Sequence, residues 1–261
     1  MPTKYKLIIW HVLIVLLALV FWTYAAGVIA QPSDSFELGP ESIVYLVVFA
    51  SVIALGLALF RERWLVLSFT AVAGAPYLLV SPSYVTLGGL AFMVLFMFFS
   101  WSVTVSELRE RSKVNIRAVL RRSLTAIILA LFVAISFLAY GSPIATGMEK
   151  NERLPSNTEK FIGTVVRGTI GPRIEGSLQQ KENIIAEVTR ETFQEFNTFL
   201  KPYFRYAPPL LAFAVFFVLW GLSWFFVQLG VLLGMLIFWF LKKTNFVRIE
   251  ERDAKAETLI I

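Results

Sequence analysis

The amino-acid sequence predicts an all-α integral membrane protein: a bundle of about six transmembrane helices with one helical insertion on the extracytoplasmic side. Two observations lead to this class. The 261 residues are 57% hydrophobic with a mean hydropathy of +0.70, whereas soluble domains are about 45–50% apolar. Every Lys, Arg, Asp and Glu lies outside the long apolar runs. This is expected of segments in lipid, because a charge at mid-bilayer costs at least about 2.5 kcal/mol.

The first predicted span is residues 7–30, which follow Lys4 and Lys6. It is long enough to cross a hydrocarbon core of about 30 Å, and longer than the roughly 7–15 apolar residues of a signal peptide. We therefore expect an uncleaved anchor with a cytoplasmic N-terminus. The loop that follows has three acidic residues and no basic residue, which favours the extracytoplasmic side.

Four further spans alternate across the membrane. The second ends before Arg61, the third and fourth are joined by a tight turn at Pro82, and the fourth precedes the strongest basic cluster of the chain. That cluster has six basic and two acidic residues between Ser106 and Arg122, which marks it as cytoplasmic. The four spans are residues 43–60, 64–80, 84–105 and 123–141, and with the first they give a five-span membrane bundle over residues 1–141.

Residues 142–206 form the predicted extracytoplasmic insertion, with nine basic and eight acidic residues. Ser156 and Glu159 have the spacing of a capping box, which predicts a short helix ended by Gly171-Pro172. A second amphipathic helix is predicted from Ser177 to Leu200. Its expected apolar stripe is Leu178, Ile185, Val188, Phe196 and Phe199.

Residues 207–241 contain no charge and raise the question of one crossing or two. A single helix of this length would measure about 52 Å, well beyond the bilayer core. A hairpin would have two short arms and a cytoplasmic turn near Trp220 without a basic residue, against the positive-inside rule. We expect one long sixth transmembrane helix and a cytoplasmic tail at residues 242–261; the hairpin is the alternative. Pro208 to Gly221 then extends outward and has to bury its apolar surface on neighbouring segments.

Small residues recur every four positions in three of the predicted spans. We expect them to pack helices against one another, because lipid supplies no hydrophobic drive between helices. They are Ala50, Ala54, Ala58, Ala126, Ala130, Ala134, Gly230 and Gly234. Gln228, beside the glycines, is expected to bond across such an interface.

The basic cluster has a second interpretation, contact with anionic lipid head groups. The residues concerned are Arg109, Arg111, Lys113, Arg117, Arg121 and Arg122. Their role in orienting the chain explains them without a lipid site.

The sequence contains no motif for catalysis or cofactor binding. It has no cysteine, no HExxH and one histidine, His11, which we expect to bond to a neighbouring helix or to head groups. The glycines of GTIGPRIEGS come without the lysine and spacing of a P-loop. We therefore expect no catalytic residue, no cofactor and no metal site. The net charge of +6 is explained by membrane orientation, so nucleic acid is not an expected partner.

Two functions of different class fit these features. A non-catalytic membrane component, acting as a scaffold or accessory subunit, would be anchored in the lipid bilayer of the plasma (inner) membrane and present the insertion to a protein partner. A channel or small-solute transporter is the alternative, with Ser100, Ser102, Thr104 and Ser106 as its support. Residues at alternate positions of a helix point to more than one face, so these four hydroxyls would not line a single pore. The predicted spans also lack charges and internal repeats, so we favour the non-catalytic membrane component.

Overall fold

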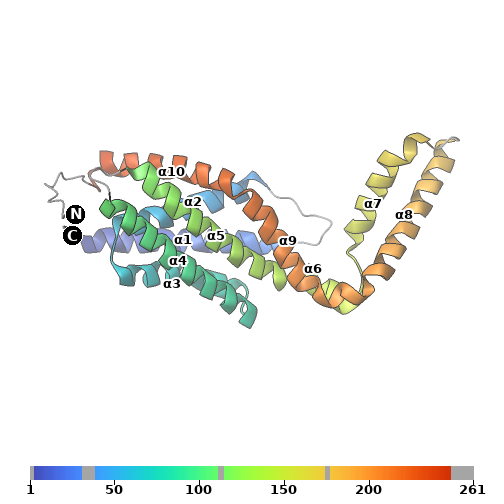
Figure 1. Ribbon diagram of the computed structural model, residues 1–261, viewed down its shortest axis with the longest axis horizontal. Coiled ribbons are helices and arrows are strands. Elements are labelled where there is room, and N and C mark those ends of the chain that lie inside the picture. The colour runs from blue at the N-terminus through green and yellow to red at the C-terminus, as the bar shows by residue number, and fades with distance from the viewer. Residues whose placement is uncertain (1–2, 31–38, 111–114, 174–176, 248–261) are drawn as a thin grey trace, which may run out of the picture.

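The computed structural model describes residues 3–30, 39–110, 115–173 and 177–247 (Figure 1). Within these ranges the protein is all-α and contains no β-strand. Seven helical stretches of the described chain are long and apolar enough to cross a membrane, which is compatible with an integral, multi-pass membrane protein.

The helices form a bundle and an outer segment that projects from one end of it (Figure 1). The bundle consists of α1 (Thr3–Ala30), α2 (Pro40–Leu59), α3 (Arg63–Val80), α4 (Tyr84–Glu110), α5 (Ile116–Tyr140) and α10 (Ser223–Lys243). The outer segment consists of α6 (Pro143–Asn151), α7 (Ser156–Thr169), the 3₁₀ helix η2 (Gly171–Arg173), α8 (Leu178–Leu200) and the 3₁₀ helix η3 (Lys201–Tyr206). Helix α9 (Ala207–Gly221) packs on α5 and joins the outer segment to α10.

Helix α6 was not predicted from the sequence, although its start carries a recognisable signal. The Ser142 hydroxyl accepts a hydrogen bond from the Ala145 amide at 3.1 Å, and Pro143 is the first helical residue. A polar cap followed by proline is a common helix start, because proline lacks the amide that would be left unpaired there.

The predicted capping box at Ser156 is wrong. The cap residue of α7 is Pro155, which offers no side-chain hydrogen bond, and Ser156 is already helical. With Pro155 in the cap position, the helix begins at Ser156, one residue earlier than the spacing predicted. A capping box forms instead at the start of α8, between Ser177 and Gln180.

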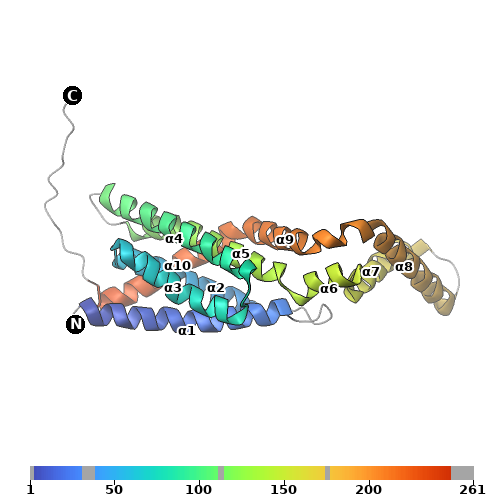
Figure 2. The ribbon, with the colours of Figure 1, turned by 90° about the horizontal axis from the view of Figure 1, so that it is seen from below.

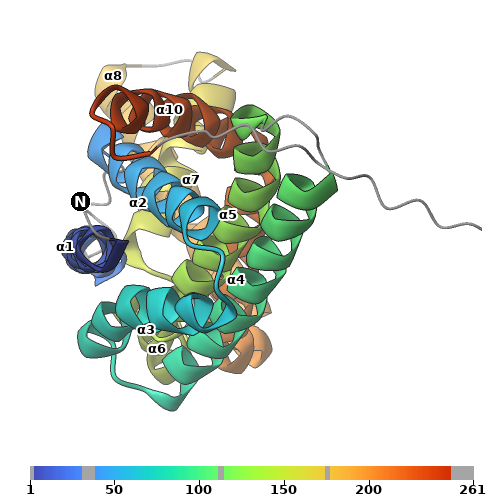
Figure 3. The same ribbon diagram turned by 90° about the vertical axis from the view of Figure 1, so that its left-hand side faces the viewer.

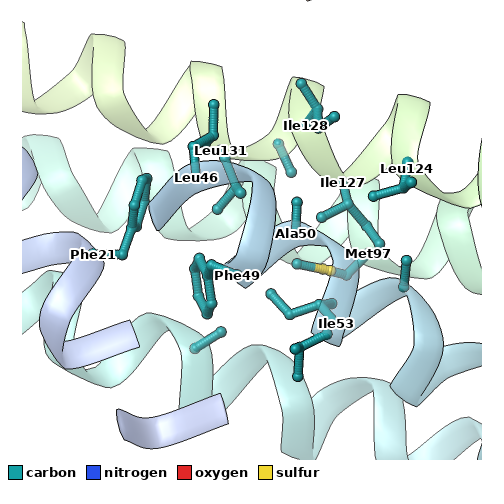
Figure 4. Packing of buried hydrophobic residues seen from close by; sticks show 14 of the residues in the cluster. Phe21, Leu46, Phe49, Ala50, Ile53, Met97, Leu124, Ile127, Ile128 and Leu131 are labelled. Carbon is teal, nitrogen blue, oxygen red and sulfur yellow. The ribbon is translucent and has the colours of Figure 1, made fainter. Parts of the chain in front are cut away.

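Helix α2 lies in the interior of the bundle, between α1, α5 and α10 (Figure 3). Every residue from Phe49 to Ala58 is buried, which is the pattern of a helix surrounded by other helices and not of an amphipathic one. Figure 4 shows Ala50 on the side of α2 that faces α5. This helix therefore supplies the centre of the apolar core.

The small residues of the predicted ridges all lie in the interior of the bundle: Ala50, Ala54, Ala58, Ala126, Ala130, Ala134, Gly230 and Gly234. A Cβ added to Gly230 would lie 3.0 Å from a methyl carbon of Leu124, and one added to Gly234 would lie 3.0 Å from Leu120. The Ser51 hydroxyl donates to the Gly230 carbonyl at 3.1 Å. The two glycines thus allow α10 to approach α5 and α2 closely.

Gln228 does not fulfil its expected role. It is half-buried and makes no hydrogen bond to any residue that the structure describes. The bond across this interface comes instead from Ser51, whose short side chain suits the close approach of the two backbones.

Aromatic donors also join the helices. Each indole or phenol group in the apolar interior needs an acceptor, and backbone carbonyls of neighbouring helices supply it. Trp10 donates to the carbonyl of Val52 at 3.2 Å, Trp22 to that of Ala73 at 2.9 Å, and Tyr77 to that of Ala134 at 3.2 Å. These bonds connect α1 to α2, α1 to α3, and α3 to α5.

We expect Ala130→Leu to lower the free energy of unfolding by about 1–3 kcal/mol, because Ala130 is fully buried and a larger side chain has to displace its neighbours. Thermal unfolding in detergent measures the effect. Ala91→Leu on α4 is the matched control, because Ala91 is exposed and should tolerate leucine. Identical melting of the Ala130 variant and the parent would contradict packing through this ridge.

Helices α9 and α10 follow one another in the same direction along the bundle, separated by the single residue Leu222 (Figure 2). Helix α9 packs on α5 and α6, while α10 packs on α5 and α2. They form one bent helix and not an antiparallel hairpin. The end of α10 returns to the start of α1, where the Lys6 ammonium donates to the Phe246 carbonyl at 2.6 Å.

Candidate functional site

Helices α4 and α5 lie side by side near the end of the bundle where α1 begins (Figure 2), and polar side chains form a seam between them. The Ser100 hydroxyl lies 2.9 Å from the Ser123 hydroxyl and donates to the Ser123 carbonyl at 3.1 Å. Thr104, one turn further along α4, is fully buried and donates to the Ser100 carbonyl at 2.7 Å. These residues satisfy one another's hydrogen bonds in a largely apolar interior.

An ion pair closes the seam. Glu107 is only 2% exposed, and its carboxylate lies 2.7 Å from the guanidinium of Arg122, which is 56% exposed. Ser100, Thr104 and Glu107 follow the i, i+4, i+7 spacing of one helix face, and it is this face that α5 covers. The channel hypothesis grouped Ser100 and Thr104 with Ser102 and Ser106, but the last two are exposed. Glu107 was not predicted as a site residue from the sequence.

Beside the ion pair, a cavity of about 470 Å³ is lined by Asn115, Arg117, Ala118, Arg121, Arg122 and Thr125. Three of the six residues for which lipid contact was the second interpretation, Arg117, Arg121 and Arg122, line this one cavity. Arg111 and Lys113 lie outside the described residues, and so does the side chain of Arg109. The guanidinium groups of Arg117 and Arg121 are exposed and suit an anionic group such as a phosphate, whereas that of Arg122 is paired with Glu107.

The seam has hydroxyls and one carboxylate but no histidine. His11 lies between α1 and α3, where its Nδ1 donates to the Leu7 carbonyl at 2.9 Å and its Nε2 accepts from Ser68 at 2.6 Å. A carbonyl can only accept, so this pairing fixes which ring nitrogen carries the proton in the neutral ring. Among the residues that the structure describes, no three His, Asp or Glu side chains are arranged to hold a metal ion.

The outer hairpin, α7 with α8, is the second candidate site. Its two helices pack through Val166, Ile185 and Phe193, and Gly163 allows Thr189 to approach. Arg153 lies over the Phe193 ring at 5.8 Å, and the Leu154 amide donates to Asn197 at 2.8 Å. These contacts fix the hairpin at the end nearest the bundle.

The predicted apolar stripe of α8 is only partly the buried face. Ile185 is buried, but Leu178, Phe196 and Phe199 are exposed, and the true contact line is Ile185, Thr189 and Phe193. The cause is length: α7 has 14 residues and α8 has 23, so both ends of α8 extend beyond their partner. On α7, Phe161 and Val165 are exposed as well.

Comparison of the chain with protein-family models, with curated proteins and with solved structures gave no match.

Proposed function

We propose that this protein is a non-catalytic membrane component, a scaffold or accessory subunit, whose bundle anchors the outer hairpin so that the hairpin can bind a protein partner on the extracytoplasmic side. The observation that carries the proposal is the exposed apolar surface of α7 and α8. A two-helix unit cannot cover it, and Phe161 and Phe199 remain 69% and 71% exposed. Exposed aromatic residues grouped on one projecting element are typical of interaction sites.

The proposed topology has six crossings: α1 to α5, and α10 together with the adjoining part of α9. The first five helices alternate in direction, and α10 ends where α1 begins. An even number of crossings is what returns the chain to its starting side. The arginines of the polar seam then lie at the cytoplasmic end, in agreement with the positive-inside rule, and the hairpin lies outside. The membrane we propose is the plasma (inner) membrane.

The alternative, a channel or small-solute transporter, has the polar seam as its support. Deeper in the bundle, the buried hydroxyls of Thr70 and Ser136 donate to carbonyls of their own helices at 2.7 Å and 2.8 Å. Because these hydroxyl protons are already donated to carbonyls of the same helix, the hydroxyls are poor hydrogen-bond donors for a transported solute. We therefore place the seam at the cytoplasmic boundary as a structural contact with an adjacent anion-binding surface.

A photo-cross-linkable residue at Phe161 should capture a partner protein in intact cells, and one at Gln194, an exposed polar position of α8, should give much less adduct. Val165→Asp should abolish the capture, because a carboxylate at an apolar contact is left without solvent or partner. The substitution itself should change the stability of the chain by less than about 0.5 kcal/mol, since Val165 is a surface residue. Equal adducts at both positions, or adducts to lipid alone, would overturn the proposal.

A further inference from the structure

The first half of α9 extends past the outer end of the bundle. Leu120 lies opposite Gly234 and Leu124 opposite Gly230, so α5 and the α9–α10 helix run antiparallel in a fixed register. About sixteen residues further along α5, its last residue, Tyr140, comes level with about Ala214. Ala207 to Phe213 therefore lie beyond that level, and in the proposed topology they stand outside the hydrocarbon core.

This projecting helix is apolar on its free side as well as on its packed side. Among the described residues it packs mainly on α5 and α6, with fewer contacts to η3 and α10. An exposed line of large side chains, here called the aromatic ridge, runs along its other side into α10. The ridge consists of Leu210, Phe213, Phe217, Trp220 and Trp224, which are between 54% and 68% exposed. The expectation that this segment buries its apolar surface within the chain is therefore wrong for one face.

The spacing of the ridge points to a helical partner. Its members follow at intervals of three, four, three and four residues, which is the a and d pattern of helices that pack side by side. Beside it lie two small exposed residues seven apart, Ala214 and Gly221. Nothing in the described chain lies within 4 Å of a Cβ built on Gly221, so packing within the protein does not require a glycine there.

We propose that the aromatic ridge is the contact face of a parallel homodimer, in which the α9–α10 helices of two copies pack about a two-fold axis along the membrane normal. The inference rests on the proposed membrane topology, which gives all copies the same orientation. A partner that covers the ridge has to be apolar along its whole length, because the ridge runs from outside the membrane boundary to inside it. A second copy of this chain meets that requirement in register.

Charge and area both support a second copy. In a parallel two-fold pair each residue faces its own kind, so a charge on the ridge would meet a like charge; residues 206–241 carry none. An aromatic side chain buries about 150–250 Å² when fully covered, so five half-exposed residues on each of two copies give roughly 1,000 Å². That area reaches the size of about 1,000 Å² expected of a specific interface, and Ala214 and Gly221 leave room for the partner's rings.

The protein has no cysteine, so single cysteines can be placed from Leu210 to Trp224 and oxidised in native membranes. We expect disulfide-linked dimers at the five ridge positions to exceed those at Leu211, Val215 and Leu219 by at least about fivefold, because a disulfide requires Cβ atoms about 3.5–4.5 Å apart. Leu95→Cys, at an exposed position on α4, reports random collision. Yields at the ridge no higher than at Leu95, or without the three-four repeat, overturn the proposal. A cross-link to a different protein in place of the dimer also overturns it.

A second variant tests the interface while the reporter cysteine stays at one position. Gly221→Leu should reduce the yield of the Phe213→Cys dimer by at least about tenfold, because it fills the space left for the partner. Gly27→Leu on α1 is the matched control, since a Cβ at Gly27 also meets nothing within 4 Å. Equal loss in both variants contradicts a role for Gly221 at the interface. Failure of the topology would show separately, in the labelling of cysteines from the two sides of the membrane, which requires no cross-link.

Discussion

Arg122→Ala is expected to lower the free energy of unfolding by about 2–3 kcal/mol, because it removes a 2.7 Å ion pair made by the buried carboxylate of Glu107. The value lies below the largest costs of broken buried pairs, since Arg122 is 56% exposed and water already screens its side of the contact. The measurement is the midpoint of thermal or denaturant unfolding of the purified protein in mild detergent.

Two control variants test whether the effect of Arg122→Ala comes from the ion pair with Glu107 and not from the loss of a positive charge or of side-chain packing. Arg121→Ala removes a neighbouring exposed arginine of the same helix and should change the free energy by no more than about 0.5 kcal/mol. In a Glu107→Gln background the Arg122→Ala substitution should cost much less than in the parent, because no buried charge remains. If the Arg122→Ala and Arg121→Ala variants unfold at the same midpoint, the ion pair between Glu107 and Arg122 makes no net contribution to stability.

The positions of the long helices could be predicted from the sequence because length, hydropathy and charge act over whole segments. The apolar run at residues 43–60, most of α2, can satisfy its backbone in lipid as a helix, and the basic residues after it mark its end. The ends of α4 and α5 were harder to place. Both helices extend beyond their apolar runs into charged sequence, because Glu107 and Arg122 pair across the helices.

The polar seam was visible in the sequence only in part. The i, i+4, i+7 spacing of Ser100, Thr104 and Glu107 can be read from the chain, but a buried carboxylate looks like a loop charge until its partner is known. The prediction of the buried residues in the outer hairpin was limited in the same way. Periodicity showed that α7 and α8 have apolar faces, whereas which residues are covered depends on the length and register of the partner helix.

Labelling of single cysteines by a membrane-impermeant reagent should give all-or-none results that fix the course of residues 207–241. Asn151→Cys should be labelled only from outside, and Lys243→Cys only from the cytoplasmic side, because in the proposed topology α9 and α10 cross once, and α10 ends beside the start of α1. Trp220→Cys should not be labelled from the cytoplasmic side. A hairpin would place Trp220 at a cytoplasmic turn without a basic residue and would send Lys242 and Lys243 outside, against the bias that orients the other loops. Labelling of Lys243→Cys from outside together with Trp220→Cys from inside would establish seven crossings. The outer hairpin would keep its side in that case, whereas the parallel pairing of the aromatic ridge would lose the continuous course of α9 and α10 on which it depends.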